Sequence, residues 1–84
     1  MNLSWTDNSW EEYLYWQSHD KKVLKKINTL LKDIKREPYE GMGKPEKLKY
    51  ELAGCWSRRI TDEHRLVYEV HEFYIIVISC RYHY

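Results

Sequence analysis

The clearest pattern in the chain is an apolar stripe at helical spacing between Asp20 and Glu37. The apolar side chains recur about every 3.6 residues, which is the period of an α-helix. Asp20 is a suitable N-cap, and Pro38 stops the helix. The pattern therefore predicts an amphipathic helix with a lysine-rich outer face. The stripe is Val23, Leu24, Ile27, Leu30, Leu31 and Ile34, and the opposite face carries Lys21, Lys25, Lys32 and Lys35.

A helix and a strand are predicted ahead of that element. Thr6 or Asp7 offers an N-cap for a helix that ends at residues 17–19. Residues 2–5 alternate between polar and apolar side chains, as a half-buried strand does. The apolar face of this first helix comprises Trp10, Tyr13, Leu14 and Trp16.

A loop divides the helical half of the chain from a strand-rich half. Residues 38–45 contain both prolines of the chain, and Pro and Gly mark turns. Four β-prone segments follow: 46–52, 56–61, 65–70 and 73–81. We therefore expect one α+β domain over residues 1–84, with two N-terminal helices packed on one face of a mostly antiparallel sheet of about four to five strands.

The parity of the predicted strands indicates an uncovered sheet face. Alternate residues of a strand point to opposite faces, so Arg65 and Arg59 are expected away from the helices. A face lined with Arg is a candidate binding surface, and an ordinary solvated face is the alternative. The predicted helix-facing residues are Leu66, Tyr68 and Val70 on one strand and Trp56, Arg58 and Ile60 on the preceding one; the predicted outer residues include Val67 and Glu69.

Composition limits the class of protein only partly. The chain has 14 basic and 13 acidic residues and a formal charge of +1, so a polyanion partner would require the fold to segregate the charges. No apolar run approaches the roughly 20 residues of a membrane span, and no leader is apparent. A cytoplasmic protein without membrane association is expected. Cys55 and Cys80 leave a single disulfide open.

The last five residues collect groups that handle protons and bases. The chain ends Cys80-Arg81-Tyr82-His83-Tyr84. His can donate or accept a proton near neutral pH, and Tyr can stack on a base. A merely exposed terminus is the alternative. Cys80 and His83 have a ligand-like spacing, but no second short pair accompanies them, so no metal and no cofactor are expected. No P-loop or nucleophilic triad is apparent.

Several motifs together resemble the YoeB toxins, which belong to the RelE/ParE group of bacterial toxin–antitoxin systems. The resemblance spans the whole chain, and the order and spacing of the motifs make it specific. The motifs are Trp5, Tyr13-Leu14-Tyr15-Trp16, Gly41-x-Gly43-Lys44-Pro45-Glu46-x-Leu48-Lys49, Trp56-Ser57-Arg58-Arg59-Ile60, His64-Arg65-Leu66-Val67-Tyr68 and the terminal Cys80-Arg81-Tyr82-His83-Tyr84.

The resemblance implies a RelE/ParE-like microbial RNase fold and a ribosome-dependent endoribonuclease that cleaves mRNA in the A site. It implies partners too: mRNA on the 70S ribosome with its rRNA, and a YefM-like antitoxin. Formation of a homodimer is left open. The implied catalytic residues are Glu46 as general base, Arg65 as stabiliser of phosphate charge and His83 as general acid; the implied substrate-binding residues are Lys49, Arg59 and Tyr84.

A non-enzymatic toxin on the same scaffold is the alternative. The ParE branch binds a DNA topoisomerase instead of cutting RNA. Such a binder has no need to retain Glu46, Arg65 and His83 together, so their joint presence favours the ribonuclease.

Overall fold

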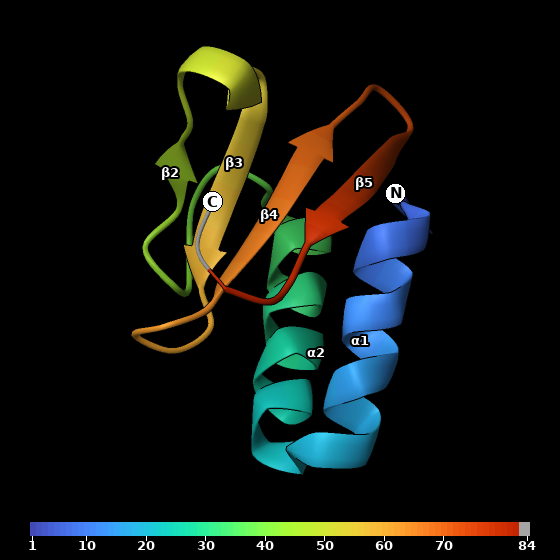
Figure 1. The fold of residues 1–84 in the computed structure, drawn as a ribbon. Helices are drawn as coiled ribbons and strands as arrows, with labels where there is room; N and C mark the ends of the chain where they lie inside the picture. Colours follow the sequence, from blue (N-terminus) through green and yellow to red (C-terminus); the bar gives the residue numbers. More distant parts are fainter. Residues whose placement is uncertain (83–84) are drawn as a thin grey trace.

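The structure, a computed structural model, describes residues 1–82 as two long helices and a five-stranded sheet (Figure 1). A short 3-10 helix, η1, interrupts the strand-rich half. The elements in chain order are β1 (Asn2–Trp5), α1 (Asp7–His19), α2 (Lys21–Arg36), β2 (Glu46–Lys47), η1 (Tyr50–Leu52), β3 (Cys55–Arg59), β4 (Arg65–Val70) and β5 (Tyr74–Ser79). The predicted α+β class and element order are confirmed.

The sheet has the strand order β1-β5-β4-β3-β2. The pairs β2–β3, β3–β4 and β4–β5 are antiparallel, and only β1 joins β5 in parallel. The first and last strands of the chain therefore lie side by side, and β1 forms one edge of the sheet. Figure 1 shows α1 and α2 side by side, with the strands crossing over them. The prediction of a mostly antiparallel sheet covered by both helices is confirmed.

Both helices begin at the predicted caps. The Thr6 hydroxyl accepts a hydrogen bond from the Ser9 backbone N–H, and the Ser9 hydroxyl accepts one from the Thr6 N–H. This reciprocal pair satisfies donors that the first helical turn leaves free. The Asp20 carboxylate accepts from the backbone N–H groups of Lys22 and Val23 at the start of α2. Neither these helices nor any other in residues 1–82 is long and apolar enough to cross a membrane.

The main core lies between the helices and the inner face of the sheet. The apolar stripe of α2 supplies Ile27, Leu30 and Ile34, which are fully buried. The contribution of α1 differs from the prediction, because Trp10 is 44% exposed and Ser9 is buried instead. The Ser9 hydroxyl donates to the Val77 carbonyl at 2.7 Å, so a small polar residue lets α1 approach β5 closely.

The predicted strand over residues 46–52 is wrong beyond its first two residues. The chain pairs with β3 at Glu46 and Lys47 and then turns into η1. Tyr50 has a φ of 58°, which a continuing strand cannot accommodate. The turn folds Leu48 and Leu52 onto the outer face of the sheet, where they pack with Cys55, Val67 and Ile78. A small second core therefore covers part of the face that was expected to be open.

The two cysteines lie in different parts of the structure. Cys55 belongs to the small outer core, and Cys80 belongs to the main core. Both are buried free thiols, so the disulfide that the sequence left open is not formed.

A buried arginine connects α2, the sheet and the loop that precedes β2. The Arg58 side chain has no exposed surface, and its guanidinium presents five N–H donors. Each of these donors has a protein acceptor. The acceptors are the Tyr68 hydroxyl (3.1 Å), an Asp33 carboxylate oxygen (2.5 Å) and the backbone carbonyls of Met42 (2.9 Å), Glu37 (2.7 Å) and Glu40 (3.0 Å). We call Arg58, Asp33 and Tyr68 the clamp.

Asp33 and Tyr68, the other two residues of the clamp, also bind the backbone of this loop. The Asp33 carboxylate accepts from the Met42 N–H at 2.9 Å, and the Tyr68 hydroxyl donates to the Pro38 carbonyl at 2.6 Å. Gly41 sits against the same carboxylate at a φ of 123°, and a Cβ there would lie 2.2 Å from an Asp33 oxygen. The loop is thus held in one conformation, and β2 begins directly after it.

The clamp makes stability depend on acidity in a defined direction. Hydrogen bonds from Arg36, Met42 and Arg58 hold the pKa of Asp33 well below the usual range for an aspartate. A carboxylate whose pKa is lower in the folded state stabilises the fold above the unfolded pKa, and this contribution is lost as the pH falls.

We therefore expect the wild-type free energy of unfolding to fall more steeply below about pH 4 than that of Asp33→Asn. The variant should be less stable at pH 7, and the two curves should approach each other in acid. Chemical denaturation between neutral and acidic pH measures both curves. Parallel curves across the whole range would contradict the role given to Asp33.

Candidate active site

Two arginines face each other across the outer side of the sheet. Arg59 of β3 and Arg65 of β4 are register partners, and directly opposed residues share a face. Arg59 is exposed and Arg65 is half-buried. Like charges placed opposite each other destabilise a sheet. A pair of this kind is suited to an anion, because each planar guanidinium can donate two parallel hydrogen bonds to phosphate oxygens. The predicted outward direction of both residues is confirmed.

Glu46 lies on the same face as the two arginines. It is the register partner of Ser57, which stands two residues before Arg59 on β3. Residues two apart on a strand point the same way, so the carboxylate projects from the face that carries Arg59 and Arg65. Glu46 is exposed, so its carboxylate is accessible from solvent. The clamp and the bond from the Arg59 N–H to the Gly43 carbonyl (2.7 Å) set where β2 starts.

One nitrogen of Arg65 is tied to the hairpin that precedes it. Nη1 donates to the carbonyls of Thr61 (2.6 Å), Asp62 (3.1 Å) and His64 (3.0 Å). These bonds draw the guanidinium toward the β3–β4 turn and limit its rotation. A preorganised cation stabilises developing charge without first having to reorient.

Lys49 lies in a hollow next to Glu46. The hollow measures about 310 Å³ and is lined by Glu46, Lys47, Leu48, Lys49, Tyr50 and Leu52. Lys49 and Glu46 are thus close along the chain and border one surface depression. Tyr50 is 91% exposed and holds a positive φ. Its ring offers a surface on which a base can stack, and the sequence analysis did not single it out.

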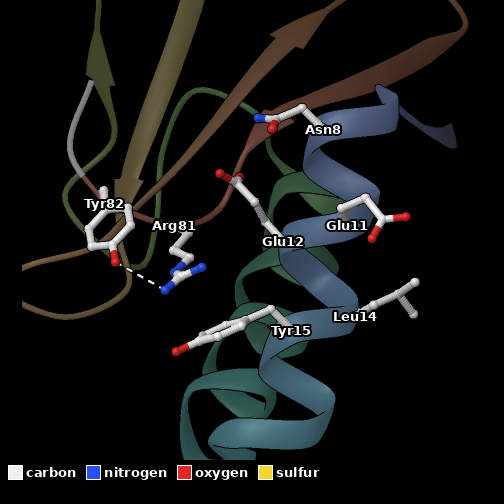
Figure 2. A pocket seen from close by; sticks show the side chains of 7 residues that line it. All are labelled: Asn8, Glu11, Glu12, Leu14, Tyr15, Arg81 and Tyr82. Atoms are coloured by element: carbon white, nitrogen blue, oxygen red, sulfur yellow. Dashed lines mark hydrogen bonds between the residues drawn. The ribbon is translucent and has the colours of Figure 1, made fainter.

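The C-terminal segment crosses from β5 toward the start of β4. Arg81 lies over the ring of Tyr15, with the guanidinium carbon 3.6 Å from the ring centroid. Its Nη2 donates to the Tyr82 hydroxyl at 3.0 Å, as the dashed line in Figure 2 shows. His83 and Tyr84, predicted as catalytic and substrate-binding residues, lie outside the described residues.

Two side chains of α1 anchor this segment at Cys80. The Glu12 carboxylate accepts from the Cys80 N–H at 2.8 Å, and the Trp16 indole donates to the Cys80 carbonyl at 2.9 Å. Burial, reinforced by the nearby Glu12 charge, raises the pKa of the Cys80 thiol to about 12. The thiol therefore stays protonated and packs as an apolar group, and the chain leaves the core at a fixed point.

Sequence reasoning missed the groups that support these residues. Arg58 was assigned correctly to the inner face, but its partner Asp33 was not anticipated because it looks like one charge among many on α2. The signal that was present is spacing, since Asp33 stands three residues after Leu30 of the apolar stripe and so lies on the same side of the helix. Among residues 1–82, no group of three or more His, Cys, Asp or Glu side chains is arranged to hold a metal ion.

Comparison with known proteins identifies the class of bacterial protein to which the chain belongs. Residues 5–84 match the family model of the YoeB-like toxin of bacterial type II toxin-antitoxin systems. The chain is therefore a toxin of the type II class. Within that class it belongs to the YoeB-like family.

Individual relatives are similar to this chain over its full length, in sequence and in structure. Toxin YoeB of Escherichia coli strain K12 is 58% identical over 84 residues, which cover 100% of both proteins. The structure of a YoeB/ParE toxin from Agrobacterium tumefaciens is similar with a TM-score of 0.97 and 51% identity, covering 100% of both chains.

Staphylococcus aureus YoeB is a third relative, and its structures include assemblies. A YoeB dimer is similar with a TM-score of 0.93, and a heterotetrameric YoeB–YefM toxin–antitoxin complex with 0.92. Both chains are 53% identical to this one, and the match covers 100% of this chain and 98% of theirs.

Removal of one arginine from the opposed pair should relieve repulsion. We expect Arg59→Gln to raise the free energy of unfolding at low salt by roughly 0.2–1 kcal/mol, and the gain to shrink as salt screens the charges. Sulfate should stabilise the wild type more than the variant, because it bridges the pair.

Urea denaturation at low and high ionic strength, with and without sulfate, measures this effect. Lys47→Gln is the matched control, since it removes an exposed cation from the adjacent strand but from the opposite face. Equal behaviour of the two variants would show that Arg59 and Arg65 do not interact through their charges.

Proposed function

We propose that this chain is a ribosome-dependent mRNA endoribonuclease that acts as one domain over residues 1–84. The observation that carries the proposal is the opposed pair of Arg59 and Arg65 on the sheet face that also presents Glu46. A carboxylate beside two cations is what a phosphodiester transfer needs: a base for the nucleophile and fixed positive charge for the phosphate. Membership of the YoeB-like family supports the same reading.

In the proposed reaction, the RNA supplies its own nucleophile. Glu46 removes the proton from the ribose 2′-hydroxyl, whose oxygen attacks the adjacent phosphorus. Arg65 stabilises the charge that grows on the non-bridging oxygens, and His83 protonates the leaving 5′-oxygen. The products are a 2′,3′-cyclic phosphate and a 5′-hydroxyl. No metal-bound hydroxide is required, because the attacking oxygen belongs to the substrate.

Three further residues would hold the substrate. Arg59 and Lys49 would bind phosphates of the RNA, and Tyr84 would help position the nucleotide. Lys49 borders the same hollow as Glu46, which supports a phosphate contact there. Each of these roles follows the family resemblance, and Arg59 has in addition the geometric support of its register with Arg65.

The proposed setting of the reaction is the ribosome, in the cytoplasm. The net charge of +1 is too small to provide strong affinity for free RNA. The outer face of α2, however, exposes a row of cations that can contact rRNA phosphates: Lys21, Lys22, Lys25, Lys32 and Lys35. Because S. aureus YoeB forms a complex with YefM and also a dimer, we propose a YefM-like antitoxin as inhibitor and self-association as a second property of this chain.

A cleavage assay with a matched pair of variants tests the proposal. Translating ribosomes with a defined message are treated with wild type, Glu46→Ala or Glu51→Ala. Glu51 is also exposed and lies only five residues away in η1. Loss of the general base should slow cleavage by roughly 10²–10⁴-fold, while Glu51→Ala should cut like wild type.

Mapping of both fragment ends identifies the chemistry. Cyclic phosphate and 5′-hydroxyl ends that disappear only with Glu46→Ala are the expected result, and free RNA with EDTA is run in parallel. If a folded wild-type protein leaves the message intact, the ribonuclease proposal is wrong, and inhibition of DNA topoisomerase becomes the next activity to test.

A further inference from the structure

The backbone of Tyr82 has a conformation that needs an explanation. Its φ is 64°, a left-handed value that L-residues with a bulky side chain rarely adopt. Burial does not account for it, because the Tyr82 side chain is 52% exposed. Residues with such strain persist only where their surroundings hold them, and they cluster at active sites.

Both polar groups of the Tyr82 backbone are held by adjacent residues at the start of β4. The Tyr82 N–H donates to Nδ1 of His64 at 2.7 Å, and the Tyr82 carbonyl accepts from the Arg65 N–H at 3.1 Å. The C-terminal segment is therefore registered against Arg65 by one side-chain bond and one backbone bond. Of the two, only the bond to His64 depends on the identity of a side chain.

The His64 ring is buried and contacts three neighbouring residues: Trp16, Glu63 and Tyr82. It is 8% exposed, and it meets the Trp16 ring edge to face at a centroid distance of 4.8 Å. The His64 backbone N–H donates to the Thr61 hydroxyl at 3.1 Å. Because an amide N–H can only donate, Nδ1 carries no proton; Nε2 is then the protonated nitrogen, 3.3 Å from a Glu63 carboxylate oxygen.

Packing alone would not require this residue type. An apolar side chain of similar size would also occupy the space beside Trp16, but it offers no acceptor for the Tyr82 N–H. The bond from the Tyr82 N–H to Nδ1 is partly buried, and a donor that is shielded from water without a partner is costly. The acceptor at Nδ1 therefore supports the left-handed turn at Tyr82.

We propose that His64 is a positioning residue for the cleavage reaction. Its neutral ring holds Tyr82 and so sets the point from which the chain continues into His83, relative to Arg65. The inference rests on the proposed function, in which His83 is the general acid. A misplacement of about 1 Å at a reacting group can lower a rate by roughly 100-fold.

Two variants of nearly equal size separate positioning from packing. His64→Asn keeps an acceptor oxygen near the position of Nδ1, whereas His64→Leu keeps the volume without an acceptor. For each full-length protein we would measure thermal unfolding, the exchange rate of the Tyr82 amide by NMR, and the single-turnover cleavage rate at saturating ribosomes.

Both variants should lose similar stability, since both lose the aromatic contact with Trp16. His64→Leu should cut roughly 100-fold more slowly, with an unchanged ribosome concentration at half-maximal rate, and its Tyr82 amide should exchange faster. His64→Asn should restore most of the rate and of the protection.

The outcomes separate this inference from the proposed function. Equal cleavage rates in the two variants, or a Tyr82 amide equally protected in both, would overturn the positioning role. If the wild type itself does not cleave, the proposed function fails, and the positioning role of His64 in cleavage fails with it. The amide exchange would still decide whether His64 holds Tyr82.

Discussion

Arg58 is the residue on which the arrangement of this protein depends. A guanidinium without exposed surface is costly to bury, and it is tolerated here because five acceptors satisfy its five donors. Three of those acceptors are carbonyls of the loop between α2 and β2. The charge thereby fixes a segment rich in Gly and Pro that has little core of its own. Removal of Asp33 would leave the buried Arg58 charge without its carboxylate partner, and breaking a buried ion pair in this way typically costs about 3–5 kcal/mol.

In the proposed function the clamp matters because the loop that it holds leads directly into Glu46. The candidate site is assembled from segments far apart in the chain: β2 supplies Glu46, the β3–β4 pair supplies Arg59 and Arg65, and the tail is brought to the start of β4 through Tyr82. Each segment has its own support: the clamp holds the loop before β2, the hairpin carbonyls hold Arg65, and His64 holds Tyr82. Glu46, Arg59 and Arg65 lie on strands of the sheet, and the pairing of these strands fixes the positions of their backbones.

Local patterns predicted most of the fold. Apolar periodicity and caps identified both helices, and strand parity placed Arg59 and Arg65 on the outer face, because these signals arise within one element. Partners that are distant in sequence were not predictable in the same way. The Asp33–Arg58 bond spans 25 positions and the His64–Tyr82 bond spans 18. The end of β2 was missed because Leu48 and Leu52 are as apolar as strand residues, and only the positive φ at Tyr50 shows the turn. The catalytic and substrate-binding roles stay predictions for all six residues to which they are given: Glu46, Lys49, Arg59, Arg65, His83 and Tyr84.

A single 2′-deoxynucleotide in the message tests the central claim most directly. Ribosomes would be stalled with a defined message in the A site, carrying either ribose or deoxyribose at the cleaved nucleotide. If the ribose 2′-hydroxyl is the nucleophile that Glu46 activates, the deoxy substitution must abolish cleavage at that position, while the unmodified message yields a 2′,3′-cyclic phosphate. Cleavage of the deoxy message at the same position, or fragments with a 5′-phosphate, would contradict the account.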